Sequence, residues 1–176
     1  YYAAYNLRNI GKALYVIASQ IKLGEECTLL CLSFNHAMAL NIRYKKKYEQ
    51  QYYVIKFYDP NDTARHKRVI RSKLNQFPEL CMTEFLSKNH INSYFSLSKS
   101  ITLFSLVPRR ISVEPIIDFD SELSLSDKLI ICLEFGFDKQ LKQCIREIKD
   151  MRLNLADQYD LLVPKSQKLG LYIALA

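Results

Sequence analysis

The chain has 176 residues, of which 49% are apolar, so it is long enough to bury a hydrophobic core and is not a disordered tail. Its formal charge of +7 raises the question of a nucleic-acid partner, but no helix-turn-helix, zinc-finger or RNP motif accompanies its basic clusters, so we expect no direct nucleic-acid binding. No apolar run reaches the roughly 18 residues that span a bilayer, which predicts a soluble chain with no membrane partner.

The chain opens with a predicted helix and then a predicted strand. Apolar residues recur at three- and four-residue steps over residues 6–22, which is typical of an amphipathic helix, and Gly24 is its expected stop. The apolar run at 27–34 has no clear period and predicts a buried strand. Further elements expected in this half are strands at 66–71 and 100–107 and a helix at 79–87.

Two alternating segments, 36–44 and 53–59, predict a β-hairpin that turns between Lys47 and Tyr48. Their more apolar faces coincide in only one set of registers, because strand side chains alternate between the two faces of a sheet. The expected register pairs Ile42 with Tyr53, Leu40 with Ile55, Met38 with Phe57 and His36 with Asp59.

From Leu123 onward the pattern predicts helices only. Ser126 is the expected N-cap of a helix over 127–135, and Gly136 its expected stop. Asp138 should cap the next helix, which should pack against the first as an antiparallel hairpin because the turn is so short. Its expected core face is Leu141, Cys144 or Ile145, and Ile148, and further helices are expected around Pro164.

The sequence thus predicts an α+β fold in two parts. Residues 1–115 should form an antiparallel sheet with an N-terminal helix, and residues 116–176 a helical segment. The apolar end of the chain suggests burial against the preceding helices or an interrupted repeat array.

The expected hairpin places His36 across from Asp59 on the core side. A carboxylate at that distance fixes the tautomer and orientation of an imidazole and stabilises its protonated form, as the acid does in a nucleophile–His–Asp triad. The alternative is a structural pair, in which a carboxylate satisfies a histidine at the end of a sheet and no chemistry follows. The spacing alone leaves both interpretations open.

The cysteines offer no obvious nucleophile. A reactive thiol usually lies at a helix start beside a protonated histidine, but Cys27 and Cys31 lie inside an apolar strand-like run and are expected to be inert core residues. Cys81, Cys132 and Cys144 lie within helical stretches, and none heads a helix. Without a C-x-x-C pair or closely spaced histidines, we expect reduced thiols, no metal site and no cofactor.

The segments "NHAMAL" at 35–40 and "YVIKFYDPNDTARH" at 53–66 resemble the OspD and EspL family of type III secretion effectors, also termed Shigella enterotoxin-like. This resemblance implies a papain-like cysteine protease domain followed by ankyrin-like helices. It also implies that His36 and Asp59 match the catalytic histidine and aspartate of the family. The catalytic cysteine of the family lies far upstream of the histidine motif, and no cysteine of this chain occupies a corresponding position.

Two functions of different class follow from the resemblance. In the first, which the missing nucleophile favours, the chain is a non-catalytic binding protein that resembles the anti-activators of the family. Its implied partners are a secretion chaperone and an AraC-type transcription activator, or a host target protein. In the second, it belongs to a cysteine protease whose nucleophile lies upstream of Tyr1, so the chain alone would be inactive. Either protein would reside in the bacterial cytoplasm before secretion into a host cell.

Overall fold

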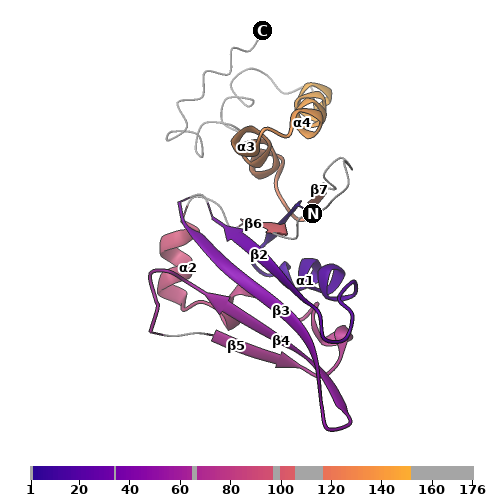
Figure 1. The fold of residues 1–176 in the computed structure, drawn as a ribbon. Helices are drawn as coiled ribbons and strands as arrows, with labels where there is room; N and C mark the ends of the chain where they lie inside the picture. Colours follow the sequence, from indigo (N-terminus) through magenta and orange to yellow (C-terminus); the bar gives the residue numbers. More distant parts are fainter. Residues whose placement is uncertain (1, 34, 65–66, 97–99, 106–116, 152–176) are drawn as a thin grey trace. The chain divides into compact units, whose positions relative to one another are not determined.

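A computed structural model describes residues 2–33, 35–64, 67–96, 100–105 and 117–151. The chain divides into two compact units, residues 1–122 and residues 123–176, and each is described by itself (Figure 1).

A seven-stranded sheet organises the described part of the first unit. The strand order is β5-β4-β3-β2-β6-β1-β7, and all neighbours pair antiparallel except β1 and β7, which are parallel. The α+β class and the antiparallel sheet expected from the sequence are therefore confirmed. The strands are β1 (Tyr2–Asn6), β2 (Glu26–Leu32), β3 (Ala37–Lys47), β4 (Gln50–Tyr58), β5 (Lys67–Arg71), β6 (Ser100–Ser105) and β7 (Ile117–Phe119).

The β3–β4 hairpin forms, but its register differs from the expected one by two residues. Leu40 pairs with Phe57 instead of Ile55, because the two residues that connect the strands are Tyr48 and Glu49. Tyr48 has a φ of 52°, a left-handed conformation that Asn or Gly usually supplies in tight hairpins, so no turn signal is present at this position. A shift of two residues keeps every side chain on its expected face.

The helical elements of the first unit differ more from expectation than the strands do. The helix predicted at 6–22 is shorter in the structure: Asn6 ends β1, and the helix covers only Ile10–Ala18. Gly24 does not stop the helix. Gly24 lies in the turn before β2, with a φ of 89°, and donates its N–H to the Tyr44 carbonyl at 2.9 Å. Residues 79–87 contain only a short 3-10 turn. The helices of this unit are α1 (Ile10–Ala18), η1 (Leu74–Gln76), η2 (Met82–Glu84) and α2 (Lys88–Tyr94).

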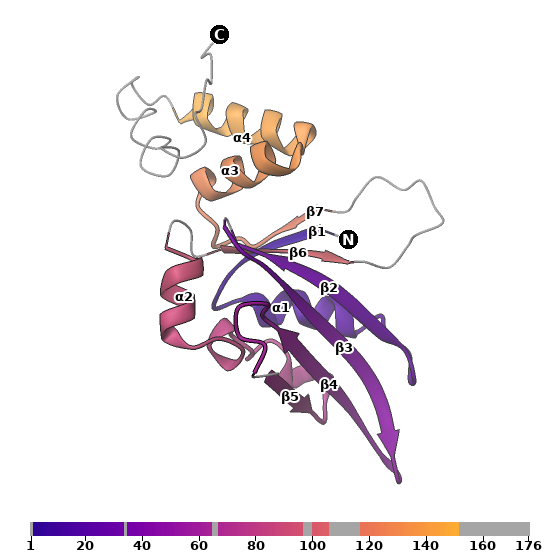
Figure 2. The same cartoon turned by 60° about the vertical axis from the view of Figure 1, so that its left-hand side comes forward.

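The core of the first unit lies on one face of the sheet. Figure 2 shows α1 behind β2 and β3 on that face. Leu14 of α1 and Leu40 of β3 are fully buried, and Phe77 and Phe85 from the segment with the 3-10 turns join the same cluster. The opposite face of β3, β4 and β5, which we term the outer face, carries exposed side chains such as Lys56.

The second unit contains two described helices, α3 (Leu125–Phe135) and α4 (Asp138–Asp150). Ser124, and not Ser126, caps α3, since its hydroxyl accepts the Asp127 N–H. Gly136 ends the helix in the left-handed conformation with a φ of 67°, as expected. On α4, Cys144 and Ile148 are buried, whereas Asp138 lies in the first turn instead of capping the helix. The helices expected around Pro164 lie outside the described residues.

Candidate active site

His36 is the last residue of the tight connection between β2 and β3. The Ser33 N–H donates to the His36 carbonyl at 2.9 Å, and the Ser33 hydroxyl also donates to that carbonyl at 3.3 Å. These bonds fix the backbone of His36 at the point where β3 begins. The imidazole is therefore held at one end of the sheet, beside the strand and not within it.

Asp59 follows β4 directly and opens a tight turn. Its carboxylate accepts the Asn61 N–H at 2.9 Å, and its carbonyl accepts the Asp62 N–H at 3.1 Å. Asp and Asn favour such turns because their short side chains bond backbone groups two residues further on. Because β3 and β4 are antiparallel neighbours, the start of β3 and the end of β4 meet at the same end of the sheet.

The two side chains are in direct contact. His36 Nε2 lies 2.7 Å from Asp59 Oδ1, and the side chains are only 11% and 4% exposed. The expected register would have opposed them directly, whereas the observed one brings them together diagonally, since both still point toward the core side. The contact expected from the sequence therefore forms despite the shifted register.

Helix α2 supplies two more side chains to this cluster, which we term the His36–Asp59 site. The Tyr94 hydroxyl donates to Asp59 Oδ2 at 3.0 Å, and the Tyr94 ring lies 4.0 Å from the His36 ring between centroids. His90 Nδ1 lies 3.8 Å from the same Oδ2, and its ring stacks on Tyr94. Both carboxylate oxygens of Asp59 are thus occupied.

The charge of Asp59 is stabilised by this arrangement. Burial of the carboxyl pulls its pKa upward, but the hydrogen bonds from His36, the Asn61 N–H and Tyr94 outweigh burial, so the pKa of Asp59 lies below its usual value. Burial, together with the neighbouring carboxylate, raises the pKa of Tyr94, which keeps its hydroxyl protonated and able to donate. The site therefore holds an ionised carboxylate against a histidine at neutral pH.

Sequence reasoning missed Tyr94 and His90. The helix that carries them was not expected, because "KNHINSY" has few apolar residues to set a period. A signal was nevertheless present: Ser87 accepts the His90 N–H as an N-cap, and His90 and Tyr94 are four residues apart, so they share one helix face.

No described thiol interacts with His36. Cys27 and Cys31 are buried in β2, and burial raises the pKa of the Cys31 thiol. Cys81 is partly exposed and its sulfur lies 2.8 Å from the Thr83 hydroxyl. Cys132 and Cys144 are buried in the second unit, and burial raises the pKa of Cys132 to about 12. A buried thiol whose pKa is raised in this way is protonated and poorly nucleophilic.

The arrangement can orient an imidazole. With Nε2 held by Asp59, Nδ1 has no partner in the described part of the chain and is the nitrogen that could receive a proton from a nucleophile. The structure describes no cluster of three or more metal-ligating side chains and no helix long and apolar enough to cross a membrane.

A histidine held by a buried carboxylate at the end of an antiparallel sheet is typical of the base-and-acid half of a nucleophile–His–Asp hydrolase site. The family model described as the ShET2 enterotoxin N-terminal region matches residues 6–166, and the chain belongs to this family. The family resemblance seen in the sequence is thereby confirmed.

One curated relative is similar to the chain in amino-acid sequence. The chain is 26% identical over 138 residues to the effector protease OspD3 of Shigella flexneri, and the match covers 77% of this chain. It covers only 24% of the relative, so the chain spans about a quarter of that protein's length. No solved structure matches the chain.

Proposed function

We propose that the chain is part of a type III secretion effector whose His36 and Asp59 serve a cysteine protease reaction. The observation that carries this proposal is the 2.7 Å bond between His36 Nε2 and Asp59 Oδ1. Membership in the enterotoxin family and the similarity to an effector protease support it. In this function the protein is made in the bacterial cytoplasm and secreted into a host cell, where its partners are host proteins.

His36 is the general base of the proposed reaction and Asp59 its orienting acid. A cysteine thiol gives its proton to His36 Nδ1, and the thiolate attacks a peptide carbonyl carbon. The imidazolium, stabilised by Asp59, then protonates the leaving amine, and water hydrolyses the resulting thioester. Since none of the five cysteines of the chain interacts with His36, we assign the nucleophile to a segment of the protein outside these 176 residues.

The cysteines also favour a second function. If the complete protein has no suitable thiol, the His36–Asp59 site is structural and the protein is a binding regulator. It would then act as an anti-activator that binds an AraC-type transcription activator and a secretion chaperone. The buried thiols of Cys31 and Cys132, whose pKa values burial raises, are the observation that supports this alternative.

Cleavage of proteins in host cells distinguishes the two functions. The full-length protein and its His36→Ala variant are expressed in host cells, and newly formed protein N-termini are compared by mass spectrometry. The protease function predicts N-termini that vanish in the variant, since loss of a triad member costs on the order of a thousandfold in rate. A Lys22→Ala variant, changed at an exposed residue, is the control and should retain them.

Identical N-termini in the parent and the His36→Ala variant would contradict the protease function. If co-purification with the activator and chaperone then persists in the same variant, the regulatory function gains support. Inspection of the full-length reading frame for a cysteine at a predicted helix start upstream of His36 is an independent check.

A further inference from the structure

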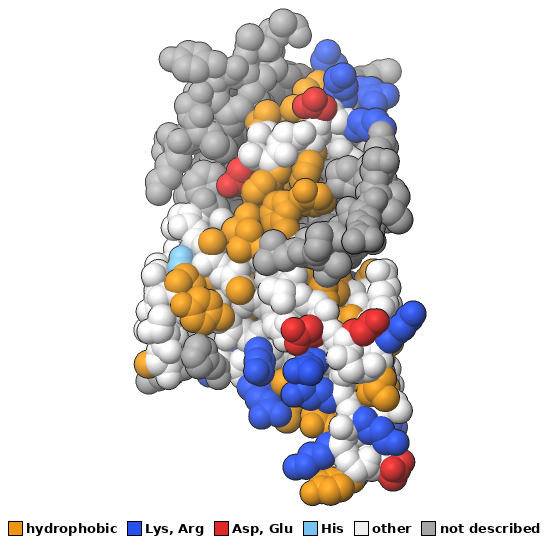
Figure 3. Space-filling view, viewed as in Figure 1, with side chains coloured by type: hydrophobic (Ala, Val, Ile, Leu, Met, Phe, Trp, Pro, Cys, Tyr) orange, Lys and Arg blue, Asp and Glu red, His pale blue; other side chains and the backbone are white. Residues whose placement is uncertain are grey.

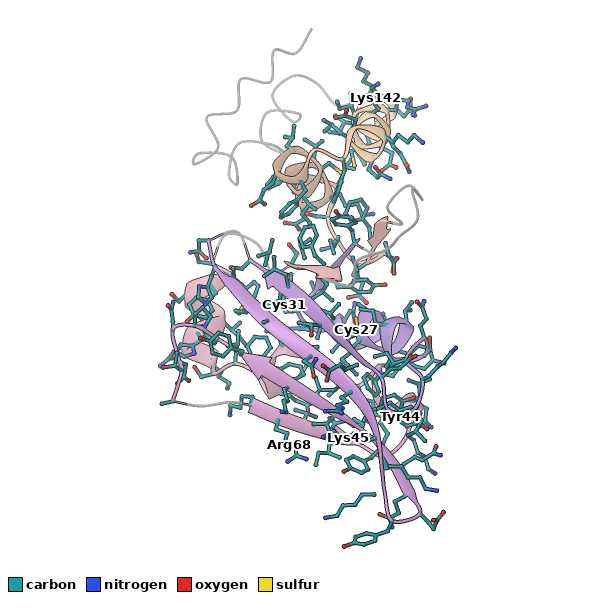
Figure 4. All side chains as sticks on the ribbon, in the orientation of Figure 1. Cys27, Cys31, Tyr44, Lys45, Arg68 and Lys142 are labelled. Carbon is teal, nitrogen blue, oxygen red and sulfur yellow. The ribbon has the colours of Figure 1, made fainter. Side chains whose placement is uncertain are left out.

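The outer face carries a line of polar and basic side chains across three strands. Asn41 of β3, Lys56 of β4 and Arg68 of β5 stand opposite one another in consecutive pairs. Figure 3 shows Lys and Arg side chains gathered with apolar ones over this region, and Figure 4 places Lys45 and Arg68 there. Two hollows of about 420 and 520 Å³ adjoin Arg68. The first is lined in part by Asn41, Lys56, Tyr58 and Arg68, and the second in part by Tyr52, Arg68 and Ile70.

Among the described residues, Lys56 and Arg68 have no acidic partner, in contrast to Arg43 and Arg71. Arg43 on the same face lies 3.8 Å from Glu26, and Arg71 at the end of β5 lies 2.6 Å from Glu84. Lys56 and Arg68 have no ion pair among the described residues, although both are exposed. Like charges directly opposite on adjacent strands destabilise a sheet. The facing Lys56 and Arg68 therefore destabilise the sheet, and no described acidic residue offsets their repulsion.

Strand β5 is an edge of the sheet. It pairs with β4 on one side only, and no other described strand pairs with it. Edge strands often carry cations that discourage pairing with other chains, and this accounts for Lys67 and Arg68. It does not account for Lys56, which lies on an interior strand, or for Ile70, whose side chain is 50% exposed on the edge itself.

We infer that the β5 edge and the outer face bind an extended acidic segment of a partner protein, which adds to the sheet as a strand beside β5. Backbone hydrogen bonds to the free edge would supply affinity. An acidic side chain on the outer-face side of the added strand would neutralise Arg68 and, beyond it, Lys56, and an apolar side chain two residues further along, on that same side, would cover Ile70. The inference does not depend on catalysis, since it uses no residue of the His36–Asp59 site.

A polypeptide fits this surface better than a nucleic acid. A phosphate backbone would neutralise the cations, but it offers no ladder of alternating donors and acceptors to the edge of a sheet. The exposed Ile70 and the partly buried Tyr52 also favour an apolar side chain beside the charge. Because strand side chains alternate, specificity follows for a carboxylate and an apolar side chain spaced two residues apart.

The test is an NMR titration of the 15N-labelled protein with the capped peptide Thr-Glu-Thr-Val-Thr-Glu-Thr, whose Glu and Val side chains share one face of a strand. We expect saturable shifts of the backbone amides of Lys67–Arg71, which report strand addition directly. In the double variant Lys56→Gln, Arg68→Gln the dissociation constant should rise at least about tenfold, because two charge-assisted contacts are lost. The matched control Lys22→Gln, Lys88→Gln removes the same charge from two exposed lysines outside β3–β5 and should bind like the parent.

Further outcomes test whether the peptide adds to the sheet as a strand. A peptide in which the Thr residues are replaced by Pro cannot form the ladder and should not shift the β5 amides. Equal weakening by both double variants, or shifts spread over the surface without the β5 amides, would show a nonspecific charge effect and overturn the inference. Shifts at Lys56 and Arg68 with single-stranded DNA but none at β5 with the peptide would overturn it as well. A well-dispersed spectrum of each variant confirms folding.

Discussion

At the scale of single residues, Asp59 determines how the His36–Asp59 site responds to acid. Its pKa is lower in the folded chain than in the unfolded chain, so the carboxylate stabilises the fold above its unfolded pKa of roughly 3.9. That contribution is lost as the pH falls through the lower, folded pKa. The hydrogen bonds to Asp59 are therefore a source of acid sensitivity.

Asp59→Asn should remove this acid-sensitive contribution. At neutral pH the variant should lose about 2 kcal/mol of unfolding free energy, because the bonds from His36, Tyr94 and the Asn61 amide no longer meet a charge. Urea unfolding at neutral pH and near pH 3 should show a smaller difference between the two conditions than in the parent. Asp62→Asn, in the same turn, is the control; if it changes the acid dependence equally, Asp59 is not the responsible group.

Tyr94→Phe isolates the second oxygen of Asp59. The ring beside His36 is kept, but the hydroxyl that donates to Oδ2 at 3.0 Å is removed. The pKa of Asp59 should rise, since a donor to its charged form is lost, and the unfolding free energy should fall by about 1 kcal/mol. Carboxyl 13C NMR measures the first effect and urea unfolding the second. An unchanged Asp59 titration would mean that Tyr94 only packs against the site.

The contact between His36 and Asp59 could be predicted from the sequence because an error of two residues in the register leaves the two side chains on the same face and still diagonal neighbours. Any register shifted by an even number of residues keeps both side chains on the core side. The roles of Tyr94 and His90 could not be predicted, because they depend on where α2 packs against the sheet, which local pattern does not encode. The nucleophile could not be predicted either, because no cysteine pattern within the chain indicates one.

At the scale of secondary-structure elements, α1 shows how packing overrides propensity. Gly11 lies inside this helix, where Gly is usually unfavourable. Its N–H donates to the Leu80 carbonyl at 3.1 Å, and a Cβ at this position would lie 2.1 Å from the Phe77 carbonyl oxygen. The glycine is therefore needed for the close approach of the segment around η1 to the helix.

Gly11→Ala should destabilise the protein although Ala favours helices. The backbone carbonyls of Phe77 and Leu80 cannot move aside cheaply, so we expect a loss of about 2 kcal/mol or more in unfolding free energy. Thermal and urea unfolding measure it. Lys12→Ala, at the next and exposed position of the helix, should change stability by less than about 0.5 kcal/mol. A Gly11→Ala variant as stable as the parent would show that the two segments separate readily.

Elements were predicted well where period and burial agree and poorly where tertiary pairing decides. The strands β2 to β5 follow apolar runs or alternation, so their positions were anticipated. By contrast, Tyr2–Asn6 forms a strand because β6 and β7 pair with it from distant parts of the chain. The apolar residues at 79–87 suggested a helix, yet they bury Met82 and Phe85 from a 3-10 turn and an irregular segment.

At the scale of the whole molecule, the reactivity of the five cysteines measures how readily each unit opens. Cys27 and Cys31 are buried in the first unit, Cys132 and Cys144 in the second, and Cys81 is partly exposed. A pulse of alkylating reagent under native conditions should label Cys81 first. The other four should react at least on the order of a hundredfold more slowly, because they become accessible only when the structure opens. Peptide mass spectrometry assigns the sites.

The same measurement in low urea compares the stability of the two units. Of the residues described on α4, only Cys144 and Ile148 are buried, whereas the first unit encloses a continuous apolar cluster under its sheet. Regions with fewer buried apolar contacts open at lower free energy. Cys132 and Cys144 should therefore become reactive at lower urea than Cys27 and Cys31. Coincident labelling of all four thiols would instead mean that the units unfold in one cooperative transition, as small single domains do.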